Sequence, residues 1–434
     1  MVSQHSSRGA AGPLNLLGRS VEELRAYLES LGEPAYRAAQ IYHALYAERR
    51  FDLAQMTNLP AALRERLARE ALIALPQIVR KHISADGTTR FVVATGREEA
   101  ETGKKAEAGE GAETREKVDA AVEVRPAAER RLRRTNAEVD AQAGAGATAT
   151  AGTTATAMST ATATAAMATV ECVFMPEENR QTICISTQAG CAVDCHFCLT
   201  ATLGLIRNLT AGEIIGQVLV ALEENRAALK PQTNVVLMGQ GEPLLNFEPV
   251  MAALRILLDP KGLGISPKHA TLSTSGIVPG IERLAREKVR PKLAISLNAS
   301  SDEQRDEIMP INRKYPLATL LEACRRYPLR PWEHLTFEYV LLGGFNDSVE
   351  DARRVVKLLA NLRVKVNLIP WNPGDLPYAK PDPARIEAFR KILVDKGVPA
   401  FVRYSRGQDV MAACGQLALI ELAASSNVAQ ISPR

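Results

Sequence analysis

Strand-like and helix-like segments alternate along the second half of the chain. From residue 180 to residue 403, short runs rich in Val, Ile and Leu, such as "NVVLMG", are followed by amphipathic stretches such as "FEPVMAALRILLD". Parallel strands need a long crossover between neighbours, so this alternation favours a parallel sheet or barrel. The pattern therefore predicts an α/β core over residues 168–420.

Small and polar residues follow several of these expected strands. Examples are "GQGEP", "STSG", "SLNAS" and "WNPG". In barrel-type α/β folds, ligands bind at the carboxyl ends of the strands, because all strands end at the same face. We therefore expect the chemistry of this chain to lie on one face of the core.

The region before the core is expected to be helical over residues 14–80. In "SVEELRAYLESLG", Ser20 is a candidate N-cap with Glu23 three residues later, and Gly32 ends the pattern. This predicts a small N-terminal helical accessory domain. The segment 81–97, which contains the strand-like run "TRFVVAT", is expected to lead into the core.

Residues 98–167 differ in composition from the rest of the chain. The first part is highly charged, and the second part is almost entirely Ala, Gly and Thr. Neither part carries enough large apolar side chains to offset the entropy of ordering, so we predict a disordered insertion. Strand-like runs flank it, which predicts a hairpin whose turn has been replaced. Residues 421–434 are expected to form a flexible tail.

Three of the seven cysteines occur within "GCAVDCHFC", as Cys191, Cys195 and Cys198. An odd, clustered set of cysteines in a long chain indicates metal binding or catalysis rather than a disulfide framework. A structural zinc site needs four ligands, and His196 is poorly placed to share an ion with its neighbours. Thiolates also hold iron–sulfur clusters, and three ligands would leave one iron open for a substrate or cofactor.

The CxxxCxxC spacing resembles the cluster loop of radical S-adenosylmethionine (SAM) enzymes, and "MGQGEP" resembles their segment that holds the SAM amino group. Further stretches, including "VECVFMPEENRQTICIST", "RNLTAGEIIGQV", "RDEIMPINRKYPL" and "SRGQDVMAACGQL", make the chain similar to the RlmN/Cfr family of RNA methyltransferases. The resemblance implies a partial (β/α)6 TIM-type radical SAM barrel, one [4Fe–4S] cluster and two SAM molecules per turnover.

The resemblance also implies where the cofactors bind. Cys191, Cys195 and Cys198 match the cluster ligands, with the fourth iron open to SAM. The residues that match SAM-contacting positions are Gly241, Glu242, Ser273, Ser296, Leu297, Asn298 and Asn372. Some family members carry histidine at the position of Asn298.

Three further residues match catalytic positions of the family. Carbon C2 of adenine is electron-poor, so the family first methylates a cysteine, which is Cys414 here. A 5′-deoxyadenosyl radical from a second SAM then takes hydrogen from that methyl group, and the carbon adds to the base. Cys184 matches the resolving cysteine that frees the product through a transient disulfide with Cys414. Glu171 matches the proton acceptor, a role that Cys184 could share.

The implied reaction is methylation of C2 of an adenosine in 23S rRNA and of an adenosine in the anticodon loop of certain tRNAs. Two alternatives are a Cfr-type reaction at C8 and a non-catalytic iron–sulfur or zinc protein. The expected electron donor is a reduced flavodoxin, and the expected state is a monomer. Candidates for a basic rim that could contact RNA are Arg207, Lys268, Arg305, Arg313 and Lys314.

The charge and hydropathy of the chain set weak limits on its partners. The formal net charge is +4, which permits a nucleic-acid partner without requiring one. No run of eighteen apolar residues occurs, and the first residues contain no apolar segment of the kind found in secretory signals. We therefore expect a cytoplasmic protein without a membrane partner.

Overall fold

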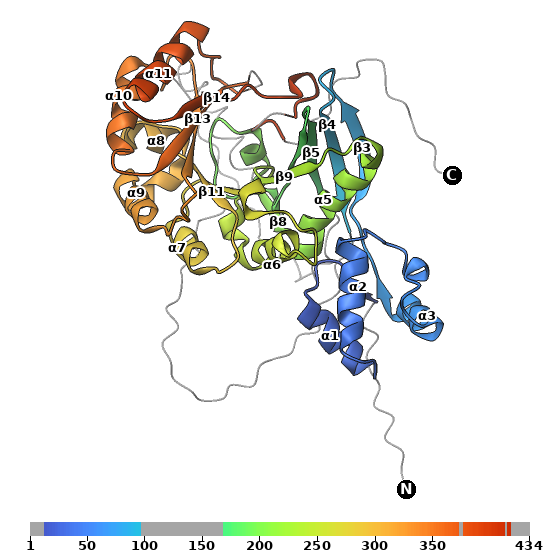
Figure 1. Cartoon of the computed structure of the whole chain (residues 1–434). Helices are drawn as coiled ribbons and strands as arrows, with labels where there is room; N and C mark the ends of the chain where they lie inside the picture. The colour runs from blue at the N-terminus through green and yellow to red at the C-terminus, as the bar shows by residue number, and fades with distance from the viewer. Residues whose placement is uncertain (1–12, 97–167, 373–375, 413–414, 418–434) are drawn as a thin grey trace, which may run out of the picture.

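The computed structural model describes residues 13–96, 168–372, 376–412 and 415–417 (Figure 1). The predicted disordered insertion at 98–167, with the tail at 421–434, lies outside the described residues. No helix in the described part of the chain combines the length and the apolar character that crossing a bilayer requires.

The N-terminal helices form a small unit beside the core. Ser20 caps the first helix, and its capping box with Glu23 confirms the predicted start. Tyr42 donates a hydrogen bond to Asp259 of the core, which helps to hold the unit in place. The elements are β1 (Leu14–Asn15), α1 (Val21–Ser30), α2 (Tyr36–Tyr46), η1 (Leu53–Gln55), α3 (Ala61–Glu70) and β2 (Ala71–Leu72).

The core contains one ten-stranded sheet with the order β14-β13-β12-β11-β10-β9-β6-β5-β4-β3. Within this sheet, each neighbouring pair from β3 to β6 is antiparallel, and each neighbouring pair from β6 to β14 is parallel. The strands are β3 (Gln77–Ile83), β4 (Thr89–Thr95), β5 (Ala168–Pro176), β6 (Arg180–Cys184), β9 (Gln232–Leu237), β10 (Ala270–Thr274), β11 (Lys292–Ser296), β12 (Leu335–Leu341), β13 (Val364–Pro370) and β14 (Ala400–Val402).

In the part of the chain that the structure describes, the two edge strands, β14 and β3, are not paired with each other, so the sheet is open, as the partial barrel implied by the resemblance requires. Helices cover its outer side (Figure 1). Thr210 caps α5 through a second capping box. The helices are α5 (Ala211–Glu224), α6 (Phe247–Leu258), α7 (Val278–Arg286), α8 (Asp302–Ile308), α9 (Leu317–Arg326), α10 (Val349–Leu358) and α11 (Pro383–Asp395).

Shorter elements connect the strands and helices. A two-stranded antiparallel ribbon, β7 with β8, lies next to the cysteine-containing loop. The bounds of the ribbon and of the 3-10 helices are β7 (Gln188–Gly190), η2 (Leu199–Leu203), β8 (Leu205–Asn208), η3 (Arg226–Ala228), η4 (Pro243–Leu245), η5 (Pro267–His269), η6 (Pro310–Arg313) and η7 (Gln408–Val410).

Strands β4 and β5 form the hairpin that the sequence predicts on either side of the insertion. Their pairing continues to Thr95 opposite Ala168, the first residue of β5. The Thr95 hydroxyl donates a hydrogen bond to the Ala168 carbonyl oxygen over 2.5 Å. The two ends of the insertion are therefore held together by the sheet itself.

We expect that residues 97–167 can be replaced by a short Asn-Gly turn without loss of the fold. Each doubling of loop length costs about 0.6 kcal/mol of closure entropy, so this replacement should raise the free energy of unfolding by about 2–3 kcal/mol. Urea unfolding of the shortened chain measures the change. A Gly/Ser linker of the original length is the control and should unfold like the wild type. A shortened chain that unfolds at lower urea or without cooperativity would contradict this expectation.

Candidate active site

The three clustered cysteines line a cavity at the carboxyl ends of the parallel strands. Cys191, Cys195 and Cys198 lie in the loop between β7 and η2, at the mouth of the core. Residues from distant parts of the sequence are gathered at this one face. The same cavity is lined by most of the residues that the sequence predicts for SAM, namely Gly241, Glu242, Ser273, Ser296, Asn298 and Asn372.

The three cysteines are partly buried and close enough to influence one another. Burial raises the pKa of Cys191 to about 12, and the neighbouring Cys198 contributes to the rise. The pKa of Cys195 also lies well above its ordinary value, first because of burial and then because of Cys198 and Cys191. A bound cation would reverse these shifts by stabilising the thiolates.

The arrangement of these thiols fits a cluster better than a single ion. Within the described ranges, no three His, Cys, Asp or Glu side chains are grouped tightly enough to hold one metal ion. In an iron–sulfur cubane each thiolate binds a different iron, so the sulfurs need not converge on one point.

Contacts from distant parts of the chain hold the cysteine-containing loop. The amide of His196 donates to the carbonyl oxygen of Ile308, and the indole of Trp371 donates to the carbonyl oxygen of Phe197 over 3.4 Å. Trp371 also lines the cavity. The loop is therefore positioned by the residue that follows β13 and by the end of α8 before any ligand binds.

Glu242 is a buried carboxylate held by backbone and hydroxyl donors. Its oxygens accept hydrogen bonds from the Ser275 amide at 2.7 Å, the Ser275 hydroxyl at 2.8 Å and the Leu244 amide at 3.1 Å. Burial raises its pKa, and these hydrogen bonds oppose the rise. In the part of the chain that the structure describes, no Lys or Arg pairs with Glu242. The ammonium group of SAM would supply the missing positive charge.

Gly241 is required by the packing of the protein itself. Its φ angle is +97°, and an added Cβ would lie 2.5 Å from Cβ of Gln188 on β7. The Gln188 side chain in turn accepts a hydrogen bond from the Glu242 amide over 2.8 Å. The glycine therefore permits close contact with β7, which places Glu242, and this explains its presence without a direct contact to a ligand.

The other residues predicted to contact SAM differ in whether they line the cavity and in the hydrogen bonds that they already form. Ser273 and Ser296 line the cavity at the ends of β10 and β11, whereas the Leu297 side chain is buried in the core and does not line it. Asn298 adopts φ +57°, and its side-chain oxygen accepts the Val340 amide at 2.9 Å. Asn372 donates to the Ser405 hydroxyl at 2.7 Å. Each asparagine therefore uses part of its hydrogen-bonding capacity within the fold.

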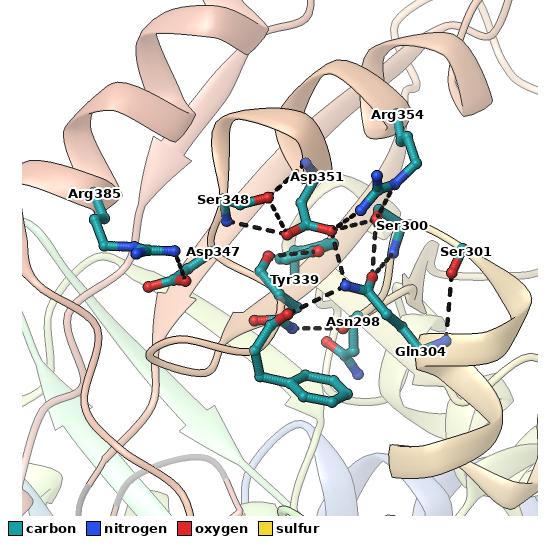
Figure 2. A network of polar contacts seen from close by, with 12 residues as sticks. Asn298, Ser300, Ser301, Gln304, Tyr339, Asp347, Ser348, Asp351, Arg354 and Arg385 are labelled. Carbon is teal, nitrogen blue, oxygen red and sulfur yellow. Dashed lines mark hydrogen bonds and ion pairs between the residues drawn. The ribbon is translucent and has the colours of Figure 1, made fainter.

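A polar network behind Asn298 holds the loop that follows β11 (Figure 2). Its centre is the Asp351 carboxylate, which is almost completely buried at the start of α10. This carboxylate accepts hydrogen bonds from the hydroxyls of Ser300 and Ser348 and from the Gln304 amide, and Arg354 pairs with it at 2.5 Å.

Glu171, the predicted proton acceptor, lies on β5 and is fully buried. One of its oxygens forms an ion pair with Arg90 on β4, which is buried as well. The other oxygen accepts a hydrogen bond from the Gln240 side chain over 3.2 Å. Sequence reasoning missed Arg90, although a charged residue within the apolar strand "TRFVVAT" was the available signal.

The same groups hold the segment on either side of Cys414, which itself lies outside the described residues. Arg90 donates to the Val410 carbonyl oxygen at 3.0 Å, and Gln240 donates to that of Leu417 at 3.4 Å. The Leu199 amide donates to the Gly415 carbonyl oxygen at 2.7 Å, which brings this segment against the cysteine-containing loop.

Cys184, the predicted resolving cysteine, faces this carboxy-terminal segment. It is buried in a small apolar cluster with Val173, Val410, Ala412 and Leu417. Three members of this cluster lie within four residues of Cys414 in the sequence.

The basic rim predicted from the sequence is wrong for Arg305. This side chain is fully buried and donates to the carbonyl oxygens of Leu297 and Ser275, so it is a structural residue. Arg207 pairs with Glu213 of α5 at 2.7 Å. Sequence reasoning also overlooked Glu338, a buried acid on β12 that lines the cavity.

Replacement of Asp351 by Asn should destabilise the protein at neutral pH. Burial alone would raise the pKa of Asp351, but hydrogen bonds from Ser300, Ser348 and Gln304 bring it below its ordinary value. The charged form therefore stabilises the fold above the ordinary pKa, and this contribution is lost as pH falls through the lowered native pKa. We expect a loss of about 2–3 kcal/mol in the free energy of unfolding at pH 7.

Thermal unfolding of the Asp351→Asn variant between pH 7 and pH 3 measures this effect, and its difference from the wild type should shrink toward the acid end. The neighbouring exposed Glu350→Gln, whose partner is the exposed Arg353, is the matched control and should change stability by less than about 0.5 kcal/mol. A difference that is independent of pH would contradict the role of the charge.

Comparison with known proteins identifies the family to which the chain belongs. Residues 14–73 match the family described as Ribosomal RNA large subunit methyltransferase N-terminal domain, and residues 185–359 match the Radical SAM superfamily. A crystal structure of a radical SAM methyltransferase from Sphaerobacter thermophilus superimposes with a TM-score of 0.73 at 37% identity, over 93% of this chain and 99% of that one.

Two curated relatives extend this similarity over most of the sequence. The probable dual-specificity RNA methyltransferase RlmN of Koribacter versatilis is 43% identical over 399 residues, which are 91% of this chain and 99% of the relative. The dual-specificity RNA methyltransferase RlmN of Anaeromyxobacter dehalogenans is 41% identical over 405 residues, which are 92% of this chain and 90% of the relative. The chain therefore belongs to the RlmN family of radical SAM RNA methyltransferases.

Proposed function

We propose that this enzyme methylates C2 of an adenosine in 23S rRNA and of an adenosine in the anticodon loop of certain tRNAs. One observation carries the proposal: a single cavity joins the three thiols, Glu242 and the strand-end serines to Gly415, next to Cys414. The names of the relatives, which are dual-specificity RNA methyltransferases, support this reaction and give no support to the C8 alternative.

The residues of the cavity fit the two cofactors that the family implies. Cys191, Cys195 and Cys198 would hold a [4Fe–4S] cluster, and Glu242 would bind the SAM ammonium. When bound and reduced, the cluster would split SAM and supply a 5′-deoxyadenosyl radical.

Cys414 and Cys184 would carry the methyl group and release the product. In this scheme one SAM methylates the sulfur of Cys414. A second SAM is consumed when a hydrogen atom is removed from the methyl group on that sulfur. The Cys184 thiolate would then attack the Cys414 sulfur and form a disulfide, and the bond between that sulfur and the transferred carbon would break, with this carbon taking up a proton to give the methyl group of the product. The packing of Cys184 against Val410 and Ala412 supports this pairing.

Glu171 would accept the proton that leaves C2 of the base. The ion pair with Arg90 stabilises the charged carboxylate that a proton acceptor needs, and Gln240 fixes its orientation. Cys184 is the competing proton acceptor. A reduced flavodoxin as the electron donor and a monomeric state complete the proposal.

The reaction is tested with anaerobically reconstituted protein and an RNA hairpin that contains the target adenosine. We expect a [4Fe–4S]⁺ signal in low-temperature EPR that shifts when SAM is added, and 2-methyladenosine in the digested RNA by mass spectrometry. Cys195→Ser should lose the EPR signal, whereas Cys324→Ser, a buried thiol of α9, should keep it. Detection of 8-methyladenosine, or of stoichiometric zinc instead of iron, would contradict the proposal.

The cysteine variants should separate the two stages of the reaction. Cys414→Ala should reduce methyl transfer below detection, because it removes the sulfur that carries the methyl group. Cys184→Ala should instead accumulate protein covalently joined to RNA, since no thiolate remains to release it. Denaturing gels and mass spectrometry of the adduct measure this. Cys172→Ala, at a buried thiol on β5, is the control, and methylation by Cys414→Ala would refute the mechanism.

A further inference from the structure

The concave side of the sheet continues below the cavity and carries positive charge. On β13, Val366 and Leu368 point into the core, so Lys365 and Asn367 face the concave side together with Ile369, which lines the cavity. On β11 the same alternation puts Lys292 on the face of Ser296, another cavity residue.

Two arginines complete this group of cations. Arg180 begins β6 and shares the face of Cys184, whose neighbour Met238 reaches the cavity. Arg403 follows β14 and donates a hydrogen bond to the side chain of Asn367 over 3.2 Å. We call Arg180, Lys292, Lys365 and Arg403 the concave cations.

The concave cations lie close enough to influence one another although they come from strands spread across the sheet. The pKa of Lys292 is lowered first by burial and then by Lys365 and Arg180, although β6 and β11 are separated by two strands. The pKa of Lys365 is lowered by burial and by Arg403. The curvature of the sheet therefore concentrates like charges in a recess.

Few carboxylates offset this charge. Arg180 pairs with Glu177 at 2.7 Å, the buried Glu338 lies near Lys365 and Arg403, and Glu333 partly opposes the lowering of the Lys292 pKa. Within the part of the chain that the structure describes, Lys292 and Lys365 have no carboxylate at ion-pair distance. Two half-buried lysines that lie close to other cations and lack an ion-pair partner would be stabilised by a bound anion.

An exposed aromatic ring lies at the entrance to this recess. Phe401 belongs to β14, an edge strand, and 46% of its surface is exposed. It pairs with Asn367, so it lies on the concave side, and the Arg403 guanidinium lies 5.5 Å from its ring centre. Cations interleaved with an exposed ring are typical of surfaces that bind single-stranded nucleic acid.

We propose that the concave cations and Phe401 bind the sugar–phosphate backbone of the RNA substrate beside the nucleotide that enters the cavity. The proposal rests on the proposed function, since it names how the same site holds its substrate. Phosphates would contact Lys292, Lys365 and Arg403, and a base next to the reacting one would stack on Phe401. Strand β14 is an edge strand of the sheet, so Phe401 lies at the side of the sheet that an extended strand of RNA could approach.

An acidic protein partner, such as an electron donor, fits these observations less well. The cations lie on the concave side of the sheet and two of them, Lys292 and Lys365, are half-buried, so an extended strand of RNA would reach them more readily than a folded protein. Stacking on Phe401 also suits a nucleobase better than a carboxylate-rich surface.

The test compares the double variant Lys365→Gln/Arg403→Gln with a matched control, Lys391→Gln/Arg390→Gln, on exposed positions of α11. Fluorescence anisotropy of a labelled RNA hairpin is measured with the reconstituted enzyme from about 0.05 to about 0.5 M salt. Removing one cation that neutralises a phosphate should lower the slope of log affinity against log salt by about 0.7, which is about fivefold in affinity at about 0.1 M salt. The double variant should therefore bind about 25-fold more weakly, and the control should bind like the wild type.

Further measurements keep the outcomes separate. RNA-independent cleavage of SAM and the EPR signal should be unchanged in the double variant, and the charge-preserving Lys365→Arg/Arg403→Lys should retain the salt slope. The single variants should each show half the change in slope, so the effect stays measurable if the double variant is unstable.

A double variant that keeps the wild-type salt slope would overturn the inference, and slower reduction by flavodoxin at an unchanged slope would assign the surface to the electron donor instead. The proposed function itself fails if the wild type cleaves SAM but methylates no RNA.

Discussion

The buried ion pair between Arg90 and Glu171 links the three parts of the molecule that must meet at the active site. Arg90 lies on β4 in the antiparallel part of the sheet, and Glu171 lies on β5, the strand that pairs with β6 at the start of the parallel part. Gln240 reaches the pair from the end of β9, and Arg90 extends it to Val410 in the carboxy-terminal segment. Removing one partner would leave an uncompensated buried charge, which typically costs about 3–5 kcal/mol.

The ion pair thus unites stability with function. The contacts that neutralise the Glu171 carboxylate also hold both sides of the segment in which Cys414 occurs. Cys184 reaches the same segment from β6 through apolar packing rather than hydrogen bonds. Apolar packing has no preferred direction, so it brings the Cys184 thiol close to the segment but does not select a covalent partner for it.

The parallel sheet determines which other residues come together. Its strands all end at the same edge, and its curvature brings side chains from different strands close together on the concave side. Its carboxyl edge gathers the cysteines, Glu242 and the serines, which are the groups expected to bind the cofactors. Its concave side gathers cations from β6, β11, β13 and the end of β14. Cofactor binding and the proposed RNA backbone contacts are therefore consequences of a single curved sheet.

Local patterns in the sequence determined a large part of this structure. The caps at Ser20 and Thr210, the alternation of strands and helices, and the hairpin across the insertion follow from short-range hydrogen bonding and periodicity. The donor types at Cys191, Cys195 and Cys198 are also set by the sequence. The tertiary structure alone decided that Arg305 is buried, that Arg90 pairs with Glu171, and that Lys292 comes close enough to Arg180 for their charges to interact. Contacts of this kind depend on how the sheet curves and on which strands become neighbours, and the spacing of residues along a chain does not specify either.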